Sequence, residues 1–377
     1  MNFNKILILL FFPIWFFFQN GEDSSFSKIK KIEHQITVGH PGNEDNGLEQ
    51  SILVEVRNKK GLAVEFYMNV ESVICVKSVC KVVPVRIYWN NLGGYQKYEL
   101  DKGVTLEKYE ADLFEKEDYV KLQSILSDLD SPFKNVRIDE ILTVVDETHN
   151  DADAVSGATA LELDEEDTVP GAALTCFTLW HWAHGDIETI IRNFAGESLK
   201  KQNFLKLLNS KNVDKQLFAV EQLDERKIYK KILIEEVIKQ TTSNNKLLKT
   251  AVNYFENSDS KIYFSAIKKL LQKGNESQKI VSLNSLLKSE LVPPKGYYNE
   301  LSLLISNLKS YQEISLFLRL MKSKNPNSLE VVSQLIPLLK SDLLISRNVY
   351  WFLKKQQLNK NQEQQLNIFY KEYQDQL

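Results

Sequence analysis

The sequence lacks an excess of positive charge and has little cysteine. Among its 377 residues, 47 Lys and Arg stand against 50 Asp and Glu, and only three are cysteines. Proteins that mainly bind nucleic acid gather a net basic field to neutralise phosphates, so we expect no nucleic-acid partner. The sequence contains neither a Cys-x-x-Cys-His haem-attachment site nor a Gly-x-Ser-x-Gly elbow around Ser156, which argues against those haem proteins and hydrolases.

The most apolar segment lies at the N-terminus. Ile6 to Phe18 follows Lys5 and precedes the polar stretch Gln19 to Ser25. This order is typical of a secretory signal peptide, and the run is short of the roughly 20 residues of a spanning helix. We therefore expect residues 1–21 to be a signal peptide or, because the small-residue cleavage pattern is poor, an N-terminal anchor. The protein is then exported, and periplasmic or membrane-associated.

Export places the cysteines where disulfides form. Cys75 and Cys80 are close in sequence and are the candidate disulfide, which leaves Cys176 as a buried thiol. The alternative is that all three are small core residues.

The chain changes character near residue 195. All five histidines and all three cysteines precede this point, and long amphipathic stretches follow it. We predict an α+β domain over residues 22–195 and an all-α domain over residues 196–377. Predicted strands are Ser51 to Arg57, Gly61 to Val70, Val82 to Trp89, with Pro84 at a strand start or sheet edge, and Tyr95 to Leu100; predicted helices are Glu117 to Asp128 and Gly171 to Trp182.

The second half shows recurring helical periodicity. Short polar breaks separate the segments, for example Thr241 to Asn245 and Lys322 to Pro326. Paired helices about 30 to 45 residues apart predict a solenoid, although a helical bundle is the alternative. The apolar segments are Phe204 to Leu208, Ile228 to Val237, Leu247 to Phe255, Ala266 to Leu271, Ile280 to Leu287, Leu301 to Leu308, Ile314 to Met321, Leu329 to Leu339 and Val349 to Leu353.

The segment with the most specific chemistry is Asp153-Ala-Val-Ser156-Gly157-Ala158-Thr159. Glycine lets the backbone approach a ligand closely, successive N–H groups can form an anion nest, and two hydroxyls are at hand. Such a turn suits a phosphate group.

This string resembles the covalent flavin-attachment motif of the FMN-binding domain family, found in the C subunit of the sodium-pumping NADH:quinone reductase and the G subunit of the Rnf complex. The resemblance implies that a flavin transferase joins FMN through its phosphate to the hydroxyl of Thr159. Asp153, Ser156, Gly157 and Ala158 match the other fixed positions. An acidic run to Asp167 follows, where many family members have another Ser or Thr.

Aromatic side chains and histidines nearby have two interpretations each. Tyr88, Trp89, Trp180 and Trp182 can cover a flavin ring or simply pack in the core. His181 and His184 are three residues apart, a spacing that zinc or haem ligands use, but no third ligand follows a recognisable spacing, so we predict no metal site.

Two functions follow. In the first, the protein is an exported electron-transfer flavoprotein that carries FMN on Thr159, and its helical half docks a redox protein or membrane complex. In the second, it is a cofactor-free scaffold whose helical half binds other proteins. The hydroxyl of Thr159 separates them, because only the first requires it.

Overall fold

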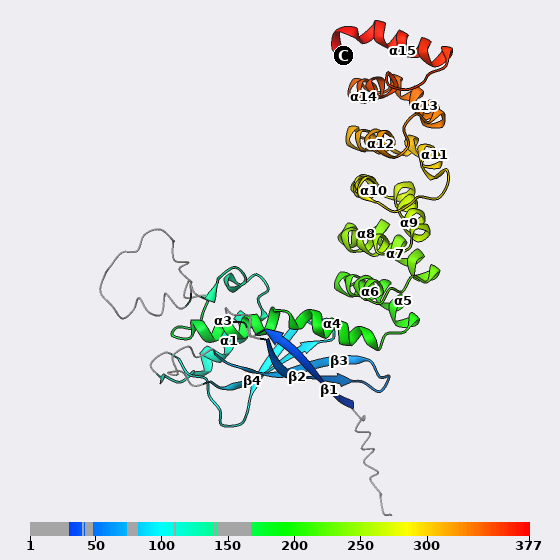
Figure 1. Cartoon of the computed structure of the whole chain (residues 1–377). Coiled ribbons are helices and arrows are strands. Elements are labelled where there is room, and N and C mark those ends of the chain that lie inside the picture. The colour runs from blue at the N-terminus through cyan, green and yellow to red at the C-terminus, as the bar shows by residue number, and fades with distance from the viewer. Residues whose placement is uncertain are drawn as a thin grey trace, which may run out of the picture.

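The computed structural model describes residues 30–39, 41, 48–73, 82–108, 111–138, 141 and 167–377. A five-stranded antiparallel sheet with helices on one face is followed by two rows of stacked helices (Figure 1). The predicted fold class, α+β followed by all-α, is confirmed. Among the described residues, no helix is long and apolar enough to cross a membrane.

The sheet is a meander in which each strand pairs with the next one in the chain, in the order β1-β2-β3-β4-β5. Alternating side chains explain its two faces, because successive residues of a strand point to opposite sides. Phe66 lies opposite Trp89 on the buried face, and Tyr67 lies opposite Tyr88 on the other face. Four predicted strands are present, and Pro84 begins β4 as a strand start. The strands are β1 Lys30–Gly39, which the sequence analysis missed, β2 Leu48–Arg57, β3 Ala63–Glu71, β4 Pro84–Asn90 and β5 Tyr95–Leu100.

Three helices cover the buried face of the sheet: α1 Lys116–Ser127, α3 Ala173–His184 and α4 Ile187–Glu197 (Figure 1). Both helices that the sequence predicts here are present. The predicted stop after α1 is a short 3-10 turn, Pro132–Lys134. Most side chains of α3 are buried, as expected for a helix that is apolar on nearly every side.

The helical half is a solenoid of two rows. Every even-row helix packs on the next, and most odd-row helices do so too. Successive helices of a row begin about 30 residues apart, close to the predicted spacing, so the solenoid prediction is supported over the bundle. The odd row is α5 Lys201–Leu208, α7 Lys231–Ser243, α9 Ser260–Lys273, α11 Tyr297–Ser302 and α13 Leu329–Leu335, closed by α15 Lys360–Tyr373. The even row is α6 Val213–Glu225, α8 Leu248–Glu256, α10 Glu276–Lys288, α12 Tyr311–Lys324 and α14 Leu343–Leu353.

Polar residues begin these helices at the breaks that the sequence shows. A side-chain oxygen at the N-cap accepts a hydrogen bond from a backbone N–H that has no partner within the helix. Asn275 and Ser310 do so at the starts of α10 and α12, and each forms a capping box, with Gln278 and Glu313. These caps define where α10 and α12 begin.

Helix α4 belongs to both halves. It packs on α3 and β3, and on α6, the first helix of the even row. Phe218 of α6 is 1% exposed and lies in the same core cluster as the sheet. The predicted domain boundary at residue 195 therefore falls in the last turn of α4. The sequence analysis did not predict α4, α6 or α15.

Candidate functional site

The predicted flavin-attachment residues lie outside the described residues. These are Asp153, Ser156, Gly157, Ala158 and Thr159. The candidate disulfide Cys75–Cys80 and the N-terminal segment 1–21 lie outside them as well. These expectations stay predictions.

The candidate flavin-stacking aromatics are divided between the two faces of the sheet. Trp89, Trp180 and Trp182 are 0%, 5% and 5% exposed and belong to the core. Trp89 donates its indole N–H to the Ala183 carbonyl at 2.8 Å. Tyr88 lies on the opposite face, where its hydroxyl donates to Glu99 at 2.6 Å. The tryptophans thus have the packing role that was the alternative in the sequence analysis.

His181 and His184 serve the packing of α3. His184 Nε2 is 2.8 Å from the Leu126 carbonyl oxygen at the end of α1, and burial lowers the pKa of both histidines. The neighbouring Trp180 donates to the Asp128 carbonyl at 2.8 Å. Neutral imidazoles therefore help hold α3 against the C-terminal end of α1. Within the described part of the chain, no three His, Cys, Asp or Glu side chains gather as metal ligands.

Cys176 is a free and fully buried cysteine on α3. Burial raises the pKa of its thiol to about 11. A thiol of this pKa stays protonated at neutral pH and is a poor nucleophile. The packing role therefore fits Cys176 better than a reactive one.

A buried carboxylate joins the sheet to α4. Glu55 of β2 is fully buried, and its two oxygens bond Arg57 at 2.5 and 2.9 Å. His34 Nε2 of β1 lies 2.8 Å from Glu55, and the His34 ring stacks on Phe194 of α4 at 3.8 Å. The hydrogen bond to Glu55 is the main reason that the pKa of Arg57 is raised. A buried charge needs such partners, so the cluster fixes α4 on the sheet.

The other side of α4 is tied to the solenoid. Arg192 pairs with Glu221 of α6, donates to the Leu92 carbonyl at 2.9 Å, and lies over the Phe218 ring at 5.2 Å. Arg226, directly after α6, donates to the Asn193 carbonyl. These contacts join the loop after β4, helix α4 and the first even-row helix into one packed unit.

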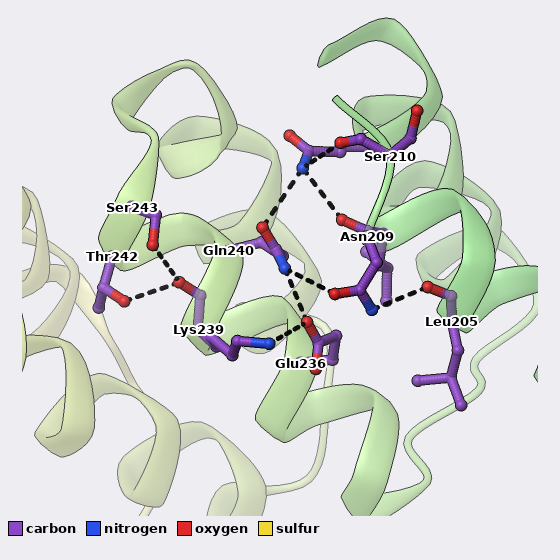
Figure 2. Close-up of polar contacts among 10 residues, drawn as sticks. Leu205, Asn209, Ser210, Glu236, Lys239, Gln240, Thr242 and Ser243 are labelled. Atoms are coloured by element: carbon purple, nitrogen blue, oxygen red, sulfur yellow. Dashed lines mark hydrogen bonds and ion pairs between the residues drawn. The ribbon is translucent and has the colours of Figure 1, made fainter. Parts of the chain in front are cut away.

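Polar side chains also connect successive repeats (Figure 2). Gln240 of α7 donates to Asn209, which follows α5, and to Glu236 on its own helix. One repeat further, buried Gln278 donates to the Thr241 carbonyl at 2.9 Å and to Asn245. The bonds to Asn209 and Thr241 satisfy groups at the ends of odd-row helices, which explains why the amide of Gln278 is buried between the repeats. This network has a structural role.

A groove on the even row is the candidate site for a partner. Its volume is about 520 Å³, and it lies between α10 and α12. Asn284 of α10 and five residues of α12 line it: Tyr311, Gln312, Ser315, Leu316 and Arg319. Tyr311 is 50% exposed. Tyr311 supplies an aromatic ring and Arg319 a guanidinium group. Asn284, Gln312 and Ser315 supply neutral hydrogen-bond donors and acceptors.

Equivalent positions extend this surface onto α14. Thirty-two residues separate Arg319 from Trp351, as they separate the helix starts Tyr311 and Leu343. The pattern of buried and exposed side chains matches at this offset, so both residues lie on the same face of their helices. Trp351 is 44% exposed, and Lys354 Nζ lies 5.0 Å from its ring centroid. We call the set Tyr311, Arg319, Lys322, Arg347, Trp351 and Lys354 the cationic surface.

The cations of this surface have no acidic partners within the part of the chain that the structure describes. Arg347 donates to a backbone carbonyl, that of Gln376, and Arg319 and Lys322 form no ion pair with any described residue. Elsewhere in the solenoid some lysines are paired, such as Lys268 with Glu300 at 2.7 Å and Lys279 with Glu313 at 3.5 Å, and others among the described residues are not. The cationic surface differs in that its cations lie on one face beside the exposed rings of Tyr311 and Trp351.

Sequence reasoning missed this surface because its members are scattered over more than forty residues in two separate helices. The usable signal is the repeat itself, since aligning α12 with α14 brings Arg319 and Trp351 to the same position. Comparisons with family models, curated proteins and solved structures give no match to this chain. The resemblance to the FMN-binding domain family therefore depends on the attachment motif alone.

Proposed function

We propose that the protein is a docking protein whose helical solenoid holds a partner protein on its even row. The observation that carries this proposal is the cationic surface, in which unpaired cations and an exposed tryptophan occupy equivalent positions of adjacent repeats. Solenoids commonly present such extended surfaces to other proteins. In the described residues the histidines, the buried tryptophans and Cys176 are engaged in packing, which fits binding better than catalysis there.

Site-specific photo-crosslinking in the native host tests the proposal. A benzophenone amino acid is placed at Asn284, Gln312 or Ser315 on the even row, or at Gln272 or Leu303 on the odd row as matched controls. We expect one and the same partner, identified by mass spectrometry, to crosslink from the even-row positions and not from the controls. Equal crosslinking from both rows, or none from either, contradicts docking on the even row.

A second function is favoured by the sequence Asp153 to Thr159. We propose that Thr159 carries FMN, as the resemblance implies, and that the docked partner is a redox protein or membrane complex. Bound FMN supplies one- and two-electron chemistry, and the protein supplies position and polarity. The buried tryptophans do not support a flavin site among the described residues, so this proposal depends on the motif.

Intact mass and flavin fluorescence of the denatured protein test this second function, after export in cells that express a flavin transferase. We expect an added FMN that is lost in Thr159→Ala and kept in Thr148→Ala, a neighbouring threonine outside the motif. If no adduct forms while a control FMN-binding domain is loaded in the same cells, the flavin proposal is wrong and the docking function stands alone.

A further inference from the structure

We infer that the cationic surface binds an acidic, extended segment of a partner protein that carries an aromatic or large apolar side chain. This inference depends on the proposed docking function and names the chemistry of the partner. It is argued from charge, from the side chains of the groove and from the order of residues along the even row.

Charge complementarity points to carboxylates on the partner. Arg319 and Lys322 of α12 are exposed and unpaired by any described carboxylate, and Lys354 of α14 contacts aromatic rings. Exposed cations of one sign attract a segment of opposite charge and speed its encounter. Trp351 and Tyr311 add aromatic area of the kind that dominates binding energy at interfaces.

The groove between α10 and α12 favours an extended segment over a helix. Asn284, Gln312 and Ser315 line it with groups that both donate and accept hydrogen bonds. An extended segment has free N–H and C=O groups that match them, whereas a helix has already satisfied most of its own. The groove therefore suits an extended backbone.

The even row also limits where the segment lies. The ninth residue of each even-row helix, from α6 to α14, is in turn Glu221, Glu256, Asn284, Arg319 and Trp351. This position carries a carboxylate on α6 and α8, a neutral amide on α10, a cation on α12 and an indole on α14. An acidic segment therefore fits α10, α12 and α14 better than α6 and α8, and a nucleic-acid strand that followed the whole row would meet carboxylates on α6 and α8.

Peptide binding to the full-length protein tests the inference. The probe is a fluorescein-labelled peptide of about 12 residues, rich in Asp and Glu with one Trp. Three helices at usual spacing cover about 20 Å, which about six extended residues at about 3.3 Å each span, and the further residues leave room for the segment to settle in register. Matched probes are the same peptide with Asn and Gln in place of the acids, and a single-stranded RNA of equal charge. We expect the acidic peptide to bind at least about tenfold more tightly than the neutral one, and more weakly in high salt.

Variants locate the binding. We expect Arg319→Glu/Lys354→Glu to weaken the acidic peptide about tenfold or more, Arg319→Gln/Lys354→Gln to weaken it less, and Trp351→Ala to weaken both peptides. The control Lys261→Glu/Lys273→Glu makes the same charge change on α9 of the odd row and should have little effect. Circular dichroism melting checks that each variant folds.

Several outcomes overturn the inference: no measurable binding of the acidic peptide, equal binding of the neutral peptide, tighter binding of the RNA, or equal loss in the α9 control. Failure of the docking function itself is recognised separately. If the docking function is wrong, no partner crosslinks from the even row. If a partner does crosslink there and its crosslinking yield is unchanged by Arg319→Glu/Lys354→Glu, only the acidic chemistry of the partner is refuted.

Discussion

Removing the Phe218 ring should destabilise both halves of the protein, because this ring of α6 lies in the core of the sheet domain. The side chain is 1% exposed and lies under Arg192 of α4. Replacing a buried Phe by Ala costs about 3–5 kcal/mol, a large part of the roughly 5–15 kcal/mol that stabilises a typical domain. We therefore expect Phe218→Ala to lower the stability of the sheet domain, although the residue belongs to the solenoid by sequence.

Phe317 of α12 provides the matched control. It is also 1% exposed, but it lies in the solenoid core cluster, remote from the sheet. Phe317→Ala should cost a similar amount within the repeats. In a solenoid each repeat contacts only its neighbours, so the loss should stay largely local and leave the sheet domain unchanged.

Urea unfolding followed by two signals distinguishes these effects. Trp89, Trp180 and Trp182 report on the sheet domain once the other two tryptophans, Trp15 and Trp351, are replaced by Phe, and far-UV circular dichroism reports mainly on the solenoid. With a urea m-value of about 1–3 kcal/mol/M, the midpoint should fall by about 1–3 M.

We expect Phe218→Ala to shift both transitions and Phe317→Ala to shift only the circular dichroism. If Phe218→Ala left the tryptophan transition unchanged, the shared core around α4 would be refuted. An equal shift of the tryptophan transition in Phe317→Ala would mean that coupling is global and not local to α4.

Three further predictions concern buried polar groups. The first uses a variant in which Cys75 and Cys80 are replaced by Ser. Because burial raises the pKa of the Cys176 thiol to about 11, Cys176 should react with Ellman's reagent at pH 8 at least about 100-fold more slowly in the native protein than in the urea-unfolded protein. A fast reaction in the native protein would contradict this. Burial lowers the pKa of His184, so the unfolded state binds a proton before the folded state does as the pH falls below about 6.5. The free energy of unfolding should therefore decline there by up to about 1.4 kcal/mol per pH unit. In urea titrations between pH 7.5 and 5, His184→Gln should show a shallower decline than the wild type, and identical slopes would refute this. Gln278→Leu leaves the Thr241 carbonyl without its hydrogen bond and should lower the free energy of unfolding by about 1–3 kcal/mol. The exposed control Gln272→Leu should change the free energy of unfolding by less than about 0.5 kcal/mol. Similar costs for the two variants would exclude a special role for the buried amide.

Much of the fold follows from simple periodicities. Alternation in Gly61 to Val70 predicts β3 because one face of the meander is buried and the other is not, and the uninterrupted apolar run before Trp182 predicts the buried helix α3. These signals succeed where burial alone decides the pattern.

Prediction fails where buried positions are polar. The amphipathic pattern of α6 contains Gln216 and Gln222, which are 7% and 3% exposed and bond neighbouring groups. In β1, His34 faces the same side as Glu55 and bonds it, and this polar side chain weakens the apolar alternation of the strand. A sequence scan treats these side chains as surface residues, because their partners belong to other elements.

The candidate site was harder to predict than the fold. Arg319 and Trp351 form one surface only because the repeats stack in register, so no local motif marks them. The flavin motif is the reverse case: it is local, and its prediction remains open because Asp153 to Thr159 lie outside the described residues.

The position of the cationic surface affects how the two proposed functions combine. The even row takes three helix steps of about 8–10 Å from α6 to α12 and four to α14, so the surface lies about 24–40 Å from the helix that contacts α4. A partner segment bound there lies several helices from the sheet domain. In the proposed function, docking would tether the partner, so that the rest of the partner reaches the sheet domain at a raised effective concentration. This makes α4 important, because its contacts with Glu221 and with the sheet, through Phe194 and His34, fix the first repeat to the sheet and so set the reach of the tether.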